Sequence, residues 1–503
     1  MHAAHLLRDR AALTPDHEAL LELATGRRFS YAELDARANR AAHLLRTAFG
    51  VRAGDRVAVL AQNSAAFVEL FFAAGKLGAI LVPLNWRLAA AELAYMLADC
   101  TPVLLACGAG HERLANELAR LAELPALLAL DGADLPAPSY EAELARASDG
   151  APETPPLTAD SPYCILYTSG TTGTPKGAVI PHRQVLWNCI STCASWSLTE
   201  RDVSPVLTPL FHAGGLFAFL TPIVYAGGRV VLGRGFDGDA DLEMIERERC
   251  TVILGVPTMF HVWREGAAYR TADFSSVRFF ISGGAPCPPS LLEAWRTEKQ
   301  VVMRQGYGLT EVGPNCFAMS DAESIAKSGS VGRPVLHLEA CLGGGGDTGE
   351  LALRGPQVCA GYWRRPDATA DVLRDGWFHT GDIVRRDDDG FYYIVGRAKD
   401  MIISGGENVY AAEVEAVFHD HPAVAEAALI GAPDERWGEV GVAIVIPRPG
   451  TRPSEAELLA FCAGRLARFK IPKRIVFAAE FPRTALGKPQ KSELRRRCLE
   501  LEA

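Results

Sequence analysis

The sequence has no excess of positive charge. Its 503 residues include 51 Lys and Arg against 60 Asp and Glu, which gives a net charge of −9 at pH 7. Proteins that bind nucleic acid through a dominant basic surface have the opposite balance. We therefore expect no nucleic-acid partner, although a local cationic pocket is compatible with this composition.

The sequence also lacks a long uninterrupted apolar run and closely paired cysteines. The most apolar stretch, residues 216–232, is broken by Pro222, two glycines and Arg229, so it should be buried within a domain rather than span a membrane. The N-terminus has no apolar core of signal-peptide length. The twelve cysteines form no C-x-x-C pair, so reduced thiols are expected. These features favour a cytoplasmic protein without an integral membrane segment, and they leave the oligomeric state undetermined, a homodimer included.

The first part of the chain alternates strand-like and helix-like segments, which is typical of βαβ units and a largely parallel sheet. The expected strands are 56–62, 79–85, 102–108, 163–167, 251–257 and 278–284, and the expected helices are 65–75 and 90–100. A Pro- and Ala-rich stretch at 132–160 should be a surface connection. The four glycines at 343–346 should form a turn between strands.

A domain boundary is expected near residue 397. The length alone suggests about three domains or subdomains. Residues 391–406 contain two strand-like runs joined by the polar segment 397–400, and a small α+β unit with its own helices and strands follows. Its expected helices are 411–420 and 454–469, and its expected strands are 425–433 and 439–447. The predicted division is therefore 1–396, a hinge at 397–400, and 401–503.

Residues 167–177, YTSGTTGTPKG, are the most informative segment. A strand-like run leads into a loop with three glycines, several hydroxyls and one lysine. Such a loop can wrap phosphate oxygens with backbone N–H groups. It is not a Walker A loop, because Gly173 and Lys176 are separated by two residues and Gly177 follows the lysine.

The same segment resembles the signature of the AMP-forming, adenylate-forming superfamily, which includes acyl-CoA synthetases, firefly-type luciferases and peptide-synthetase adenylation domains. Further motifs follow in the family's order: LTPLFHAGG (207–215), ISGGAP (281–286), QGYGLTE (305–311), GWFHTGD (376–382), GRAKDMIISGGENVY (396–410) and PRTALGK (482–488). The chain looks most similar to bacterial fatty-acyl-CoA synthetases. The resemblance implies an α/β fold, with a large N-terminal domain of mixed sheets and packed helices and a small mobile α+β C-terminal domain.

The resemblance also implies a two-step reaction. A carboxylic acid attacks the α-phosphate of ATP to give acyl-AMP and diphosphate, and the thiol of coenzyme A then displaces AMP. Both steps concentrate negative charge, so the site must supply cations and N–H donors. ATP, Mg²⁺, CoA and a small-molecule acid are the expected cofactors and partners.

Residue roles are carried over by resemblance to the family motifs. Triphosphate contacts would come from Thr168, Ser169, Gly170, Thr171, Thr172, Lys176 and, at the α-phosphate, Thr310. Glu311, with Thr168, would bind Mg²⁺. The adenine slot would consist of Gly283, Gly284, Ala285, Gly306, Tyr307 and Gly308, and GYGLTE lacks the third glycine of a dinucleotide-binding motif. Asp382 and Arg397 would contact the ribose, and Lys488 would be the catalytic lysine of the first step.

In this family the C-terminal domain rotates between the two steps. Lys399 falls at the hinge position, and Gly405 and Gly406 would face the thiol arm of CoA. Arg468 and Lys470 belong to a basic stretch that would meet the CoA phosphates, with an ordinary solvated helix end as the alternative.

The acid pocket is expected from two segments. Its candidate residues are Phe211, His212, Gly215, Leu216, Val256 and Met259. His212 would also act at the passage between ATP and acid. The set is mostly apolar and has no arginine to pair a second carboxylate, which favours a medium- or long-chain fatty acid or another apolar monoacid.

Two other functions stay open. One is an acyl-AMP ligase or a stand-alone adenylation enzyme that loads a carrier protein. The absence of a carrier serine and of a long hinge insertion favours CoA instead. The other is a nucleotide-binding relic that acts as a sensor or scaffold. The retained residues Lys176, Glu311, Asp382, Arg397 and Lys488 argue against it.

Overall fold

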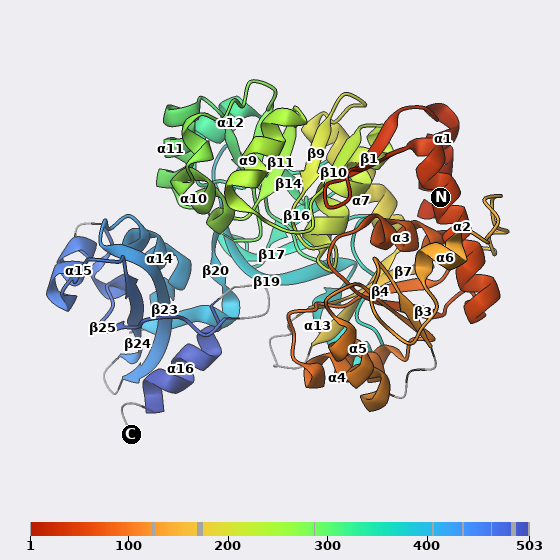
Figure 1. Cartoon of the computed structure of the whole chain (residues 1–503). Helices are drawn as coiled ribbons and strands as arrows, with labels where there is room; N and C mark the ends of the chain where they lie inside the picture. Colours follow the sequence, from red (N-terminus) through yellow and green to blue (C-terminus); the bar gives the residue numbers. More distant parts are fainter. Residues whose placement is uncertain are drawn as a thin grey trace. The chain divides into compact units, whose positions relative to one another are not determined.

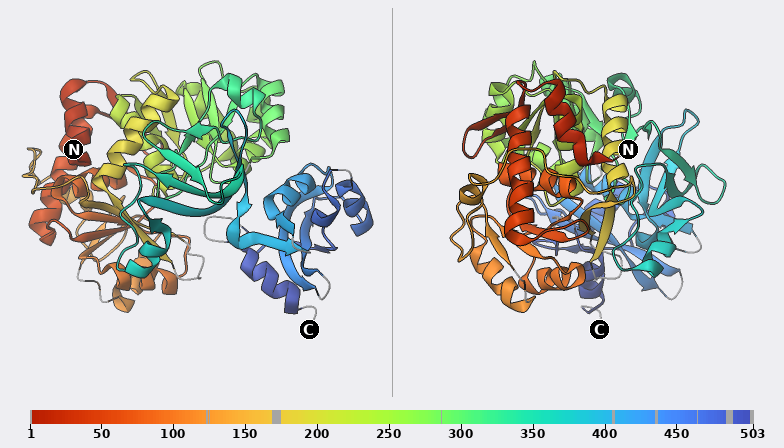
Figure 2. Two further views of the ribbon diagram at one scale, coloured as in Figure 1. Left: turned by 180° about the vertical axis from the view of Figure 1, so that it is seen from behind. Right: turned by 90° about the vertical axis from the view of Figure 1, so that its right-hand side faces the viewer.

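The computed structural model describes residues 2–122, 124, 126–168, 175–285, 287–404, 407–434, 437–463, 465–483 and 489–500 (Figures 1 and 2). The chain forms two compact units. The first comprises Met1–Cys287, Glu293–Glu339 and Leu353–Phe378, and the second comprises Pro288–Leu292, Ala340–Ala352 and His379–Ala503. The hinge at 397–400 stays a prediction.

The first unit contains a six-stranded sheet in the order β6-β5-β3-β4-β7-β8. Its strands are β3 (Arg56–Leu60), β4 (Ile80–Pro83), β5 (Leu104–Cys107), β6 (Leu127–Ala129), β7 (Pro162–Thr168) and β8 (Lys176–Pro181). All neighbours are parallel except β7 and β8, which form an antiparallel pair. The predicted βαβ alternation and parallel sheet are confirmed.

Helices cover this sheet because its strands are apolar on both faces. Successive side chains of a strand point to opposite faces of the sheet. One face packs against α4 and α5 and includes Ala58, Leu60 and Leu105, and α3 packs on the other face. The helices of this region are η1 (Ala3–His5), α1 (Leu6–Leu13), α2 (Tyr31–Phe49), α3 (Ala65–Leu77), α4 (Ala90–Cys100), α5 (Glu112–Leu121) and α6 (Tyr140–Leu144). Every residue of α3 is buried, so this helix lies in the interior of the unit.

The stretch 132–160 is more than the surface connection predicted from its composition. It contains α6, and Tyr140 at the start of that helix is 1% exposed. The Tyr140 hydroxyl donates to Oε2 of the fully buried Glu69 at 2.7 Å. A buried carboxylate needs hydrogen-bond donors, and composition alone does not reveal that this segment supplies one.

Two further sheets complete the part of the first unit that carries the candidate site. A four-stranded sheet has the order β2-β1-β10-β9, and a parallel three-stranded sheet has the order β11-β12-β13. Their strands are β1 (Glu18–Glu22), β2 (Arg27–Ser30), β9 (Val203–Val206), β10 (Arg229–Leu232), β11 (Val252–Gly255), β12 (Phe279–Ser282) and β13 (Met303–Gln305). Their helices are α7 (His182–Trp196), the π-helix η2 (Gly214–Leu220), α8 (Thr221–Ala226), α9 (Gly238–Arg247), α10 (Pro257–Glu265), η3 (Ala268–Arg270), α11 (Pro289–Lys299) and α12 (Asp321–Ala326).

Shorter strands follow α12. They are β14 (Phe317–Ala318), β15 (Arg333–Pro334), β16 (Glu339–Leu342), β17 (Thr348–Arg354), β18 (Leu373–Arg374), β19 (Trp377–Arg386) and β20 (Tyr392–Arg397), with α13 (Pro366–Val372) between β17 and β18. β14 pairs with β15, and the other five form a sheet in the order β16-β17-β19-β18 with β20 beside β19. The predicted glycine turn at 343–346 is confirmed between β16 and β17.

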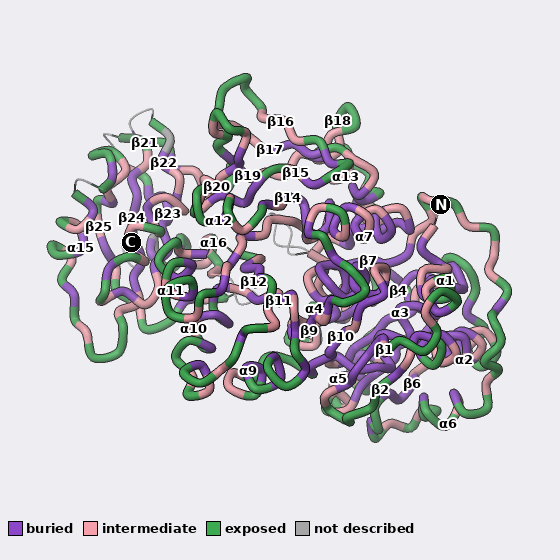
Figure 3. The backbone as a smooth tube through the Cα atoms, turned by 90° about the horizontal axis from the view of Figure 1, so that it is seen from above, coloured by how far each residue is buried: buried purple, intermediate pink, exposed green. Residues whose placement is uncertain are grey.

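The C-terminal part has a sheet in the order β22-β21-β24-β23, with β25 beside β24. Its elements are η4 (Ala398–Asp400), β21 (Met401–Ser404), β22 (Glu407–Tyr410), α14 (Ala411–His419), β23 (Val424–Asp434), β24 (Gly438–Pro447), α15 (Glu455–Cys462), η5 (Arg468–Lys470), β25 (Arg474–Phe477) and α16 (Lys491–Glu500). β23 and β24 are buried along most of their length (Figure 3). α14 and α15 pack on one face of the sheet and α16 on the other.

One predicted helix of this part is too long. The sequence predicts a helix at 454–469, but α15 ends at Cys462 and Ala463 is extended. The apolar pattern of the sequence extends to Leu466, because this residue is buried against the same core as α15 although it lies outside the helix. Gly464, a poor helix former, was the signal for an earlier end.

The apolar stretch 216–232 is divided among η2, α8 and β10, so the expectation that it is buried in a domain is confirmed. Within the described ranges, no helix combines the length and apolarity that a membrane span requires.

Candidate active site

The YTSGTTGTPKG segment joins the antiparallel strands β7 and β8. Thr168 and Lys176 are register partners at the ends of these strands, and the Thr168 hydroxyl donates to the Lys176 carbonyl at 3.4 Å. Ser169, Gly170, Thr171 and Thr172 lie outside the described residues. The two ends of the predicted phosphate loop are therefore held together by a hairpin.

Lys176, Tyr362 and Glu311 form a cluster beside this hairpin. The Lys176 ammonium lies 5.5 Å from the centre of the Tyr362 ring, and the Tyr362 hydroxyl donates to Glu311 Oε1 at 2.8 Å. The segment of Tyr362 also pairs with β8, because the Trp363 N–H donates to the Gly177 carbonyl at 2.7 Å. The hairpin thus places a cation beside the tyrosine ring whose hydroxyl donates to Glu311, a residue that is only 8% exposed.

Sequence reasoning missed Tyr362. It lies 51 positions beyond Glu311 and has no pattern of its own, so no spacing argument could connect the two residues.

The loop after β13 carries Tyr307, Gly308, Thr310 and Glu311. A Cβ at Gly308 would overlap the backbone of Pro314, so the chain can turn here only without a side chain. The Tyr307 ring packs edge-on against Phe317, with 5.6 Å between the ring centres. The loop is held from two sides by the Gln184 amide, which donates to the Thr310 carbonyl at 3.0 Å, and by the Cys359 N–H, which donates to the Glu311 carbonyl at 2.6 Å.

The carboxyl ends of β11, β12 and β13 meet at one edge of their sheet. The Gly283 N–H donates to the Gly255 carbonyl at 3.0 Å, and the Gly306 N–H donates to the Ser282 carbonyl at 2.8 Å. Gly284 has a φ of +79°, and both Gly284 and Ala285 are exposed. Ligands of parallel α/β sheets bind outside these strand ends, which is where the predicted adenine residues are placed.

One predicted acid residue, Val256, lies at the same edge. A Cβ built on Gly283 would lie 3.5 Å from the Leu254 side chain, and one built on Gly284 would lie 3.5 Å from Val256. The Leu254 side chain also lies 4.0 Å from a Cβ built on Gly214. The structure therefore brings Val256 and the segment after His212 together with the adenine glycines. The sequence analysis did not predict a role for Leu254. In the structure it is half-buried, whereas the other residues of β11 are buried.

Phe211, His212, Gly215 and Leu216, also predicted to bind the acid, lie on or near the π-helix η2, and Met259 lies on α10. His212 Nδ1 accepts from the Gly214 N–H at 3.1 Å, and the Gly215 N–H donates to the His212 carbonyl at 3.0 Å. A side chain at Gly215 would overlap the carbonyl of Pro209. Phe211, Leu216 and Met259 are buried, while His212 and Val256 are half-buried.

Asp382 and Arg397 are register partners on β19 and β20. Arg397 Nε lies 2.8 Å from Asp382 Oδ1, and Asp382 is 5% exposed. The turn before Asp382 is fixed from β17, where Glu350 accepts from the Gly381 N–H at 3.1 Å. The two residues predicted to contact ribose therefore form an ion pair with each other.

The remaining predicted residues lie in the C-terminal part. Lys399 is exposed on η4, between β20 and β21. Arg468 is exposed, whereas the Lys470 ammonium is paired with Glu413 at 2.7 Å. Gly405, Gly406 and Lys488 lie outside the described residues.

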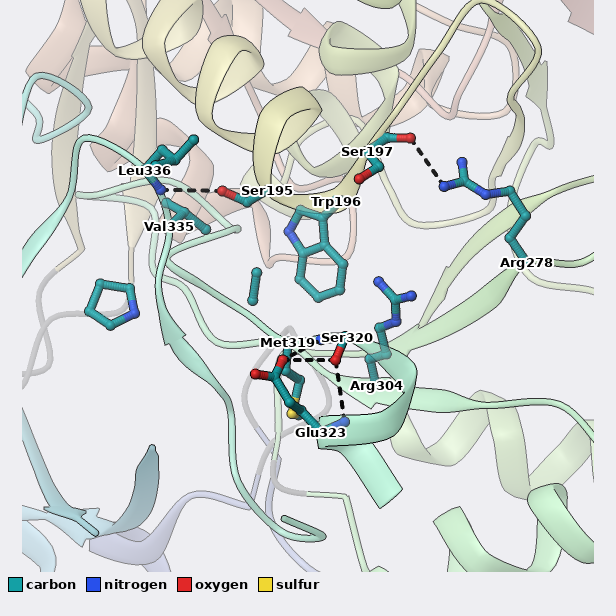
Figure 4. A pocket seen from close by; sticks show the side chains of 12 residues that line it. Ser195, Trp196, Ser197, Arg278, Arg304, Met319, Ser320, Glu323, Val335 and Leu336 are labelled. Carbon is teal, nitrogen blue, oxygen red and sulfur yellow. Dashed lines mark hydrogen bonds between the residues drawn. The ribbon is translucent and has the colours of Figure 1, made fainter. Parts of the chain in front are cut away.

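Figure 4 shows a separate cavity of about 390 Å³. Arg278, which precedes β12, lines it together with Trp196 and Arg304. Arg278 is paired with Asp202 at 2.7 Å, and Arg304 is paired with Asp321 at 2.6 Å. No predicted site residue that the structure describes lines this cavity, and each of its two arginines is already paired with a carboxylate.

Comparison with known proteins agrees with this geometry. Residues 7–363 match the model of the AMP-binding enzyme family, and residues 413–488 match that of the AMP-binding enzyme C-terminal domain. The chain is 42% identical to a feruloyl-CoA synthase of Amycolatopsis sp over 97% of both chains, and 38% identical to the long-chain-fatty-acid–CoA ligase FadD13 of Mycobacterium tuberculosis over 97% of both chains. Its fold is similar to that of o-succinylbenzoate CoA synthetase from Bacillus subtilis in complex with the acyl-adenylate intermediate, with a TM-score of 0.86, 32% identity and 98% of each chain covered.

Proposed function

The chain belongs to the AMP-binding enzyme family and is an acid–thiol ligase that uses ATP and CoA, and from this premise we propose which residues do the chemistry and which acid they activate. The reaction joins acid, ATP and CoA to give acyl-CoA, AMP and diphosphate. The observation that carries the proposal is the meeting of the adenine glycines, Leu254 and the His212 segment at one sheet edge.

A carboxylate is a poor electrophile, so the first step must make it reactive. Its oxygen attacks the α-phosphorus of ATP, the bond to the diphosphate breaks, and a mixed anhydride with AMP forms. Negative charge accumulates on the phosphate oxygens, and a site with cations and N–H donors stabilises it. Lys176 and the loop from Thr168 would hold the β- and γ-phosphates, and Thr310 would hold the α-phosphate.

Mg²⁺ fits the chemistry of the two residues predicted to bind it, Glu311 and Thr168. The buried Glu311 carboxylate and the Thr168 hydroxyl are hard oxygen donors, and Mg²⁺ commonly binds through one or two carboxylates together with substrate phosphates. Bound there, the ion would supply positive charge to the phosphates. Tyr362 keeps Glu311 oriented by its hydrogen bond.

The nucleoside would be held from two segments. Gly283, Gly284 and Ala285 would allow close approach of the adenine ring, and Tyr307 would offer an aromatic face. Asp382 would accept hydrogen bonds from the ribose hydroxyls, with Arg397 orienting the carboxylate through their ion pair.

The acid is an apolar monocarboxylic acid. Phe211, Leu216, Val256 and Met259 carry no charge, and a second carboxylate buried among such residues would have no partner. A fatty acid and a planar aromatic acid both meet this condition, in keeping with the names of the two relatives.

The C-terminal part would serve both half-reactions. Lys488 would neutralise charge on the acid and the α-phosphate in the first step. After a rotation at Lys399, the segment of Gly405 and Gly406 would admit the thiol arm of CoA. Arg468 would meet CoA phosphates directly, while Lys470 would have to exchange its partner Glu413 for them.

The test is an acid panel with and without CoA. A phenylpropenoic acid, a long-chain fatty acid and a dicarboxylic acid are each incubated with ATP and Mg²⁺, and AMP, acyl-AMP and thioester are quantified. Thioester formed in step with AMP from an apolar monoacid supports the proposal. Acyl-AMP that persists despite CoA would support an acyl-AMP or carrier-protein ligase, and the absence of acid-dependent diphosphate release would overturn the enzyme assignment.

A further inference from the structure

Helix α7 carries a buried row of polar side chains. Gln184, Asn188 and Thr192 follow one another at intervals of four residues, so they lie on one face of the helix. They are 2%, 1% and 0% exposed. Burying amides is costly unless they form hydrogen bonds, so the partners of this row indicate what it is for.

One end of the row holds the nucleotide loop. Gln184 Nε2 donates to the carbonyl of Thr310 at 3.0 Å. This carbonyl belongs to the residue next to Glu311, and the hydrogen bond ties the loop to the helix that follows β8. The loop of Thr310 is therefore anchored to α7 through its backbone.

The middle of the row holds the π-helix. Asn188 Nδ2 donates to the Phe217 carbonyl at 2.6 Å, and Asn315 Nδ2 donates to the next carbonyl, that of Ala218, at 2.9 Å. Asn315 also donates to the Thr192 hydroxyl at 3.1 Å, which joins it to the same row. π-helices are rare and occur mostly at functional sites, and here two of the backbone carbonyls are occupied by side-chain amides.

The row is also in close contact with the nucleotide loop at Gly313. This residue has a φ of +103°, and a Cβ built on it would lie 2.9 Å from Asn188 Oδ1. The space between α7 and the loop is thus filled by the Asn188 amide. A change in the position of this amide would displace both elements.

We propose that Gln184, Asn188 and Asn315 are positioning residues that fix the distance between the acid-binding and nucleotide-binding elements. On one side they hold the segment of Gly215 and Leu216, and on the other the segment of Thr310 and Glu311. The inference rests on the proposed function, because it assigns to these two elements the two reactants of the first step.

The chemical consequence follows from the geometry of the first step. The carboxylate oxygen must lie close to the α-phosphorus and in line with the leaving diphosphate. Residues that touch neither reactant can leave both binding sites intact and still displace one reactant from the other. Loss of such a residue should lower kcat for adenylation, whereas the Kd values measured separately for ATP and for the acid should stay nearly unchanged.

The experiment compares chemistry with binding in Asn188→Ala and Gln184→Met. Acid-dependent ATP–diphosphate exchange gives kcat for adenylation, and titration calorimetry gives separate Kd values for a non-hydrolysable ATP analogue and for the acid. Misplacement by about 1 Å predicts a fall in kcat of about 10- to 100-fold, with each Kd changed less than about threefold. Gln184→Met keeps the length of the side chain and removes only the amide, so it covers the case in which Asn188→Ala fails to fold.

Ser191→Ala is the matched control. Ser191 is fully buried on the same helix, but its hydroxyl has no hydrogen-bond partner in the described part of the chain. Its kcat and Kd values should stay at the wild-type level. Lower thermal stability with unchanged kcat in both test variants would show that the row serves stability alone and would overturn the inference. Absence of exchange in the wild type would instead refute the proposed function.

Discussion

The hydrogen bond from Tyr362 to Glu311 gives the sharpest test of the candidate site. Tyr362→Phe removes only the hydroxyl, and the ring that faces the Lys176 ammonium at 5.5 Å is retained. The lost bond is 2.8 Å long and ends on a carboxylate that is 8% exposed. A hydrogen bond to a charged group contributes about 1.5–3 kcal/mol, which corresponds to about 10- to 100-fold in an equilibrium constant.

The expected result is a rise in KM for ATP of about tenfold or more, because Glu311 is no longer oriented for the Mg²⁺ that accompanies the phosphates. The assay follows diphosphate release while ATP is varied at several Mg²⁺ concentrations, and the defect should shrink as Mg²⁺ rises. KM for the acid should change little, since the hydrogen bond that is removed ends on Glu311.

The matched control is Tyr140→Phe. Its hydroxyl donates to the buried Glu69 at 2.7 Å, so a similar hydrogen bond is removed away from the candidate site. The control should lower the melting temperature without changing KM for ATP. If Tyr362→Phe behaved in the same way, with unchanged Mg²⁺ dependence, Glu311 would not be the residue that binds the ion.

Three further predictions concern other parts of the chain. Lys488→Ala should slow acyl-AMP formation by about 100- to 1,000-fold and largely spare thioester formation from supplied acyl-AMP, and an equal loss in both single-turnover assays would contradict a role in the first step alone. Asp382→Asn should reduce kcat/KM for ATP by about 10- to 100-fold, and the variant should lose the wild-type preference for ATP over 2′- and 3′-deoxy-ATP if the carboxylate binds the ribose. His182 is fully buried with no hydrogen-bond partner for either ring nitrogen among the described residues, and burial lowers its pKa to about 4. Since the unfolded chain takes up this proton near pH 6.5, stability should be complete above that pH and fall by roughly 3 kcal/mol as the pH drops to 4. Denaturant unfolding between pH 7 and 4 should show this loss in the wild type and a flatter profile in His182→Leu, and parallel profiles would rule out His182 as the cause.

The apolar runs in the sequence were sufficient to predict two of the strands that position the site. The strand-like runs at 251–257 and 278–284 correspond to β11 and β12, and the glycines that follow them fall at the carboxyl ends of parallel strands. Meeting at one edge is a property of parallel sheets in general, so the sequence could predict where the adenine residues gather. The motifs indicated which residue types form the candidate site, and the predicted strands indicated where in the fold these residues lie.

The polar row on α7 could not be predicted in this way. Gln184, Asn188 and Thr192 have the spacing of an exposed helix face, and polar residues at that spacing usually face water. Only the packing of α7 among η2, α8 and β8 shows that this face is buried. Tyr362 was missed for a related reason, because a single side chain that reaches Glu311 across the fold leaves no local pattern.

If Gly215 lines the acid pocket as we propose, it limits how the preference among acids can change. Because the carbonyl of Pro209 occupies the space that any side chain there would need, enlarging or shrinking the pocket at this point would require the main chain to move. Val256, which is half-buried at the end of a strand, has no such restriction. In the proposed acid pocket, substitutions that change acid preference should therefore accumulate at Val256 rather than at Gly215.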